Sequence, residues 1–334
     1  MPDSAAPANS ARSGASGQPC VPLPFADGAR ALLPLLVIET SRHLESRRLA
    51  GTVPGAVPGA APGEPASGVA IVRAGGDGAA PRIQIEACAA GLTRGGDLVS
   101  AIERLVAAAA LAPADIAAVG VNIGPGSWTG LRIAVSAAKA LAQAAPIPLI
   151  AIDGLLASGL EFMAPGKAPD FAAAPSAPSA PSAPAEPAEP AAPSASPAGR
   201  AADSAFARKA GTLVCVLQDS GHGKVCSAVY RCLPGGWPET VVAPQMTDPE
   251  ALRETLQGSE GILLGVETLA PNTRAAWERV FPTLPEGWRA AVRPRSIEVT
   301  ARACVTAAKH GRLILRPDQI HPLAPLYLKD PYAP

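Results

Sequence analysis

The sequence predicts an α/β protein of two lobes, each a mixed β-sheet flanked by helices. Two observations predict this fold. Each half of the chain contains both strand-like apolar runs and amphipathic helix-like runs, and a long segment rich in Pro, Ala and Ser separates the two halves. In the first half, three strands precede the first helix, unlike the regular strand–helix alternation of a dinucleotide-binding fold. That order indicates a mixed sheet whose first strands are antiparallel.

Composition shows that the folded part is smaller than the chain. The 334 residues include 38 prolines, and only 4% are aromatic. Three segments are predicted to lie outside the folded lobes: an N-terminal extension at 1–30, a Pro-Gly-rich insertion at 42–67 and a linker at 164–210. Such segments cannot bury enough apolar surface to offset the conformational entropy lost on ordering.

Charge and cysteine usage argue against several classes of protein. The formal net charge is +0, so no global basic field attracts nucleic acid directly. No apolar run reaches 18 residues, so no membrane span is expected. The six cysteines form no C-x-x-C pair, which argues against zinc and disulfide frameworks and fits a reducing cytoplasm.

The first lobe is expected over residues 31–163. Apolar runs predict its strands, at 32–38, 68–73, 82–87, 116–123 and 147–152. Its helices are predicted at 98–111, 133–145 and 155–162. Asp97 is a suitable N-cap for the first of these helices.

The second lobe is expected over residues 211–330. Its strands are predicted at 212–217, 224–231, 240–243 and 261–266. Its helices are predicted at 248–256, 272–280 and 296–310, the first of them with Asp248 as N-cap and Pro249 at the first helical position. The tail at 325–329 is expected to dock back onto the folded part.

A Gly-rich loop separates the strand at 116–123 from the helix at 133–145. It consists of Gly124, Pro125, Gly126, Ser127, Trp128, Thr129, Gly130, Leu131 and Arg132. Such a turn can aim backbone amides at a phosphate, or allow close packing of the backbone. No Lys-Ser or Lys-Thr pair follows the last glycine, so the loop is not a Walker A motif.

We favour a structural role for this loop over ligand binding. Gly124 and Gly126 permit positive φ, and Ser127 or Thr129 can cap the following helix. Trp128 is expected to fill the core. Arg132 lies in the first helical turn, where a cation opposes the helix dipole, so an acidic partner is expected for it.

Four motifs in this order resemble the TsaB (YeaZ) family. The loop carries most of the resemblance because its nine residues match G-P-G-S-(F/W)-T-G-(L/V)-R. The run 37–41, Val-Ile-Glu-Thr-Ser, is similar to that family's first strand end. The hairpin from Gln218 to Tyr230 resembles D-A-R-x-G-E-V-Y in degenerate form, and 325–329 resembles the terminal P-x-Y-L-R.

The resemblance implies a two-lobed actin-like ATPase (ASKHA) fold and a role in making N6-threonylcarbamoyladenosine (t6A) in tRNA. Members of that family are non-catalytic paralogues of the TsaD/glycoprotease (M22) family. They act as scaffolds that form a heterodimer with TsaD, the metal-holding transferase, joined by the small ATPase TsaE. The chain is therefore expected to be cytoplasmic, to meet tRNA only through the complex, and to form a homodimer when alone.

The polar residues agree with a non-catalytic role, so no catalytic residue, cofactor or metal is expected. A TsaD-like metal site needs two histidines at positions i and i+4 of a helix, which none of the four histidines provides. The residues at the degenerate phosphate-loop positions are Glu39, Thr40, Ser41 and Asp219. The alternative function is a free-standing actin-like-fold ATPase or phosphotransferase, in which Glu39 and Asp219 would be the acids that hold Mg²⁺.

The resemblance places the partner interface on the first two helices. The residues expected there are Leu98, Ile102 and Leu105 of the first helix and Ile133, Ser136, Ala137 and Ala140 of the second. The small side chains of the second helix would allow a close approach. The alternative is that these faces cover the chain's own sheet.

Overall fold

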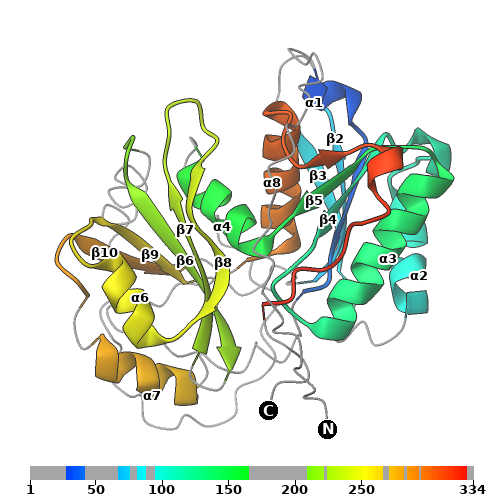
Figure 1. The fold of residues 1–334 in the computed structure, drawn as a ribbon. Coiled ribbons are helices and arrows are strands. Elements are labelled where there is room, and N and C mark those ends of the chain that lie inside the picture. Colours follow the sequence, from blue (N-terminus) through cyan, green and yellow to red (C-terminus); the bar gives the residue numbers. More distant parts are fainter. Residues whose placement is uncertain are drawn as a thin grey trace, which may run out of the picture.

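The structure is a computed structural model of the chain, which contains two mixed β-sheets with helices packed on both (Figure 1). It describes residues 28–41, 67–75, 81–87, 95–164, 209–221, 224–265, 271–281, 284–292 and 295–328. The three segments predicted outside the lobes fall almost entirely beyond these ranges. In the described part no helix is long and apolar enough to cross a membrane.

The first sheet has six strands in the order β11-β5-β4-β1-β2-β3. β1 (Leu35–Glu39) pairs antiparallel with β2 (Gly68–Arg73), and β2 pairs antiparallel with β3 (Arg82–Ala87). β1 is parallel to β4 (Ala118–Asn122), which is parallel to β5 (Leu149–Ile152). The predicted antiparallel start of a mixed sheet is confirmed.

Helices cover both faces of this sheet. α2 (Gly95–Ala108) and α3 (Trp128–Ala144) enclose one hydrophobic core with it. α8 (Ile297–Lys309) and α4 (Gly154–Met163) enclose another core on the opposite face. α8 lies so close to the sheet that a Cβ added at Gly120 of β4 would come 2.9 Å from Cys304 Sγ of α8.

The second sheet has five strands in the order β10-β9-β6-β7-β8. Its strands are β6 (Leu213–Gly221), β7 (Lys224–Arg231), β8 (Glu239–Thr247), β9 (Gly261–Gly265) and β10 (Trp288–Val292). Its own core is formed with α6 (Pro249–Leu256) and α7 (Pro271–Val280). α4 lies between the two sheets and packs against β6, β7 and α8, so one continuous core joins the lobes (Figure 1).

The end of the chain differs from the prediction, because it completes the first lobe rather than the second. α8 packs on β1, β2 and β5, and β11 (Ile314–Leu315) pairs antiparallel with β5. α8 is buried on more than one side, and Ala301, Ala303 and Ala307 allow it to fit between the first sheet and α4. The sequence pattern of a helix does not say which sheet it covers.

Two short strands and one short α-helix were not predicted. β10 has the run Trp-Arg-Ala-Ala-Val, in which alanine weakens the β signal, and β11 has only two residues. α1 (Gly28–Ala31) begins inside the segment predicted to be an unstructured extension. The helix and strand types predicted for the other elements agree with the structure, with bounds that differ by a few residues.

Candidate functional site

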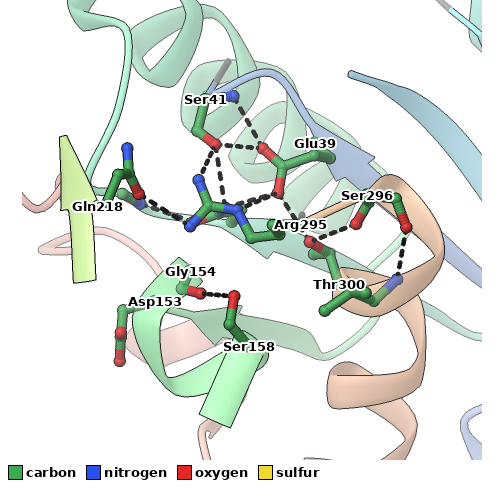
Figure 2. Close-up of polar contacts among 12 residues, drawn as sticks. Glu39, Ser41, Asp153, Gly154, Ser158, Gln218, Arg295, Ser296 and Thr300 are labelled. Atoms are coloured by element: carbon green, nitrogen blue, oxygen red, sulfur yellow. Dashed lines mark hydrogen bonds and ion pairs between the residues drawn. The ribbon is translucent and has the colours of Figure 1, made fainter. Parts of the chain in front are cut away.

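A buried polar cluster lies where β1 ends, at the junction of the two lobes (Figure 2). Glu39, the last residue of β1, has a fully buried side chain. Its Oε1 accepts hydrogen bonds from the Ser41 N–H at 2.8 Å and the Ser41 hydroxyl at 2.5 Å. Its Oε2 accepts from Asn122 Nδ2 at 2.6 Å and Thr300 Oγ1 at 2.7 Å. Four donors therefore satisfy this carboxylate.

Arg295 brings a buried positive charge to the same cluster. It lies between β10 and α8, and its guanidinium has Nε 3.8 Å from Glu39 Oε2, both side chains being 0% exposed. Nη2 donates to Ser41 Oγ at 2.7 Å, and Nη1 donates to Gln218 Oε1 of β6 at 3.1 Å. The positive charge that Glu39 needs is thus supplied by the chain itself.

Two glycines of the 124–132 loop, Gly126 and Gly130, are required by close contact with the residues that follow β1. A Cβ at Gly126 would lie 2.2 Å from Ser41 O, and a Cβ at Gly130 would lie 2.2 Å from Thr40 O. The Ser127 N–H donates to Ser41 O at 2.7 Å, and Thr40 Oγ1 donates to Gly130 O at 2.6 Å. These contacts support the structural interpretation of the loop.

Of the two predicted cap candidates, Ser127 is the N-cap of α3, because its side chain accepts from the Gly130 N–H. Glycine permits positive φ at both positions, and Gly124 adopts it, at 128°. Gly126 does not, and glycine is required there by close contact with Ser41.

Trp128 lies at the surface of α3, which corrects the expectation that it fills the core. It is half-buried and stacks on Tyr327 of the C-terminal tail, with ring centroids 3.8 Å apart. The Arg132 guanidinium lies 4.6 Å from the centroid of the Trp128 ring. Among the described residues, Arg132 therefore contacts an aromatic face instead of the expected carboxylate.

The tail docks back onto the folded part, as the sequence predicted, and the structure places it along α3. Leu326 N–H donates to Ile123 O at 2.6 Å, and a Cβ at Gly124 would lie 2.6 Å from Leu326 O. Further along, Lys139 Nζ donates to His321 O at 2.6 Å and to Leu323 O at 3.0 Å. The segment 320–328 is thus held at both ends of α3.

Asp219 lies beside α7 and accepts a hydrogen bond from Thr273 Oγ1 at 3.2 Å. Its neighbour Gln218 bonds to Arg295 in the cluster, since successive side chains of a strand point to opposite faces. The structure therefore does not bring Asp219 together with Glu39 as a pair of metal-holding acids. Gln218 was missed because it is one residue away from the acid that the ATPase alternative required.

Asp153 is a second titratable group at the lobe junction. Its Oδ1 accepts from the Leu156 N–H at 2.8 Å, which caps α4, and from Tyr230 Oη at 3.4 Å. Burial raises the pKa of Asp153 to about 6, although the Leu156 hydrogen bond and the charge of Arg295 act in the opposite direction. Burial and the nearby Asp153 raise the pKa of Tyr230 well above its usual value.

The partner-interface prediction is wrong for α2 and remains open for α3. Leu98, Ile102 and Leu105 are buried at 0%, 9% and 1% exposure in the core beneath α2, so they cover the chain's own sheet. Ser136 and Ala140 of α3 are exposed, and Ile133 and Ala137 are half-buried. The helical period of α2 identified an apolar face, but period alone does not separate a core face from a docking face.

The described residues contain no cluster of three or more His, Cys, Asp or Glu side chains able to hold a metal ion. His310 is the C-cap of α8, and its ring lies 5.7 Å from that of Trp237. His43 and His222 lie outside the described residues.

Comparison with known proteins gives one family match and related folds. Residues 96–178 match the family model of TsaD, tRNA N6-adenosine threonylcarbamoyltransferase. No curated protein matches the sequence. A solved structure of an uncharacterised protein with similarity to the peptidase YEAZ, from Pseudomonas aeruginosa, is 17% identical, with a TM-score of 0.51 over 88% of this chain and 99% of that one. YeaZ from Pseudomonas aeruginosa is also 17% identical, with a TM-score of 0.49 over 88% of this chain and 99% of that one.

The geometry and the comparisons agree on the fold. The two sheets flanked by helices are the arrangement expected from the motifs of the chain. Residues 96–178 include α2, the Gly-rich loop and α3, which carry the most specific of those motifs. This chain therefore has the two-lobed fold of the YEAZ-like structure, and its residues 96–178 match the TsaD family model.

Proposed function

We propose that this chain is a non-catalytic scaffold subunit for the formation of t6A in tRNA, acting by heterodimerisation with a TsaD-type protein. A TsaE-type ATPase joins the pair, and tRNA meets the chain only through the complex. The TsaD-family match over residues 96–178 is the observation that carries the link to t6A. The lobe junction supports the non-catalytic role, since Arg295 and four hydrogen-bond donors already engage Glu39.

The outer face of α3 is the partner surface in this proposal. Ser136 and Ala140 are one helical turn apart and exposed, so a partner helix can approach the backbone of α3 closely. Val99 of the adjacent α2 is 50% exposed, which is unusual for an apolar side chain of this size in the described part. All three residues lie in the part of the chain that matches the TsaD family model.

The pairing can be tested with one matched pair of substitutions. Ala140→Arg places a long charged side chain on the α3 face, and Ala251→Arg makes the same change on exposed α6 of the second lobe. We expect Ala140→Arg to abolish co-purification with the organism's TsaD-type protein, and Ala251→Arg to leave it intact. Equal binding by both variants would place the interface elsewhere.

The function itself is tested by depleting the chain in its own organism and measuring t6A in bulk tRNA by mass spectrometry of nucleosides. We expect t6A to fall, and to recover with the wild-type chain and with Ala251→Arg. Unchanged t6A would overturn the proposal. Mg²⁺-dependent ATP turnover by the pure chain, lost in Glu39→Gln, would favour the ATPase alternative instead.

A further inference from the structure

We propose that Arg295 is a positioning residue that acts as a built-in cation and fixes the spacing of the two lobes. Arg295 lies on the segment by which the chain passes from β10 of the second sheet to α8 on the first. Its side chain is wholly buried, and charged groups in that position need partners of opposite charge or good hydrogen bonds.

The partners of the guanidinium come from both lobes (Figure 2). Ser41 and Glu39 belong to the end of β1, and Nη2 also lies 3.5 Å from Pro125 O in the Gly-rich loop. Gln218 belongs to β6 in the other sheet, and its Nε2 donates to the same Pro125 oxygen at 3.4 Å. Separating the lobes would therefore leave Arg295 short of a buried partner.

The surrounding backbone is shaped around this side chain. A Cβ added at Gly154, the first residue of α4, would lie 1.9 Å from Arg295 Nη1 and 2.4 Å from its Cζ. Only a residue without a side chain leaves room for the guanidinium there. The planar group meets Gln218 with one nitrogen and Ser41 with another, a geometry that a lysine ammonium does not reproduce.

This arrangement has a consequence for ligands. A carboxylate at the junction of two lobes would suit a bound cation, but here the guanidinium takes that place, with Nε 3.8 Å from Glu39 Oε2, while four other donors satisfy the hydrogen bonds of the carboxylate. The contacts of the guanidinium with both lobes come from the chain's own residues. This inference does not depend on the partner proposed above.

Chemical rescue tests the built-in cation. Arg295→Ala leaves Glu39 buried without its cation, and we expect the melting temperature of the full chain to fall by about 10 °C. Guanidinium chloride at tens of millimolar should recover at least a third of that fall, whereas NaCl at the same ionic strength should not. Arg295→Lys should be intermediate. A melting temperature of Arg295→Ala equal to that of the wild type, or one that guanidinium does not raise, would overturn the proposal.

A matched arginine provides the control. Arg231 pairs with Glu239 at 2.7 Å on the surface, with side chains 41% and 49% exposed. Such pairs contribute little, so Arg231→Ala should melt near the wild-type temperature and show no response to guanidinium. A guanidinium response in this variant would show that the effect in Arg295→Ala is not specific to the buried site.

A second variant tests whether Arg295 holds the two lobes together or only stabilises the first lobe. Gln218→Leu keeps the pair of Arg295 with Glu39 and removes the partner from the second sheet, together with the hydrogen bond from Gln218 Nε2 to Pro125 O. We expect hydrogen exchange at 124–128 and 154–157, which lie at the lobe junction, to accelerate tenfold or more, with α6 unchanged. Exchange at the wild-type rate at the junction would show that Arg295 acts within the first lobe alone, and would refute the proposed spacing role.

Discussion

Gly130→Ala is the substitution that most directly tests why the Gly-rich loop contains glycine. Gly130 lies inside α3, where helix propensity alone predicts that alanine stabilises the protein by about 1 kcal/mol. The structure predicts the opposite sign. A Cβ at this position would lie 2.2 Å from Thr40 O, an atom of the backbone that cannot rotate away.

The magnitude follows from two effects. Forcing a methyl group into this contact moves α3 away from the end of β1, which costs about 1–3 kcal/mol as overpacking. The same movement stretches the 2.6 Å hydrogen bond from Thr40 Oγ1 to Gly130 O, which contributes about 1 kcal/mol. After the gain in helix propensity, we expect a net destabilisation of about 2 kcal/mol.

Urea unfolding followed by far-UV circular dichroism measures this change. Ser136→Ala, on the exposed side of the same helix, serves as the control, because it raises helix propensity and adds no contact. We expect the control to be neutral or slightly stabilising. A stabilised Gly130→Ala variant would refute the idea that contact with β1 requires this glycine.

Three further predictions concern charge, pH and the tail. A double-mutant cycle of Glu39→Gln and Arg295→Met should give a coupling free energy of about 2 kcal/mol in urea unfolding, because each single variant leaves a buried partner unsatisfied; additive effects would contradict the buried pair. The pKa of Asp153 is raised to about 6 in the folded state, so the native protein binds the extra proton, and stability should fall as pH rises from about 4 to 6. Asp153→Asn should therefore stabilise the chain by up to about 3 kcal/mol at pH 8 and have no effect at pH 4, which denaturation curves at both values would show. Tyr327→Ala removes the stack on Trp128, and limited proteolysis should then cut the tail faster than in the wild type while α3 stays intact.

Local sequence signals predicted most of the elements. The strands at 68–73 and 82–87 have their predicted bounds, because an apolar run, an alternating run and the glycine-rich turn between them define the two strands without reference to distant residues. The cap at Ser127 was predictable for the same reason, since a cap depends on neighbours within three residues.

The polar cluster was only half predictable. Glu39 and Ser41 were identified because they end a buried strand inside a motif. Arg295 and Thr300 were not, since they follow Glu39 by more than 250 residues and no local pattern shows that α8 packs on β1. Pairing of residues so distant in the chain is decided by packing, which a single sequence does not display.

The return of the chain to the first sheet has a consequence for synthesis. When residues 28–164 have been made, one face of their sheet still lacks α8, and β5 still lacks β11 as its neighbour. The apolar residues beneath α8, including Val37 and Val72, stay exposed to water until the last 40 or so residues emerge. The first lobe to be translated is therefore the last to be finished, and a fragment that stops before α8 would present an uncovered apolar sheet.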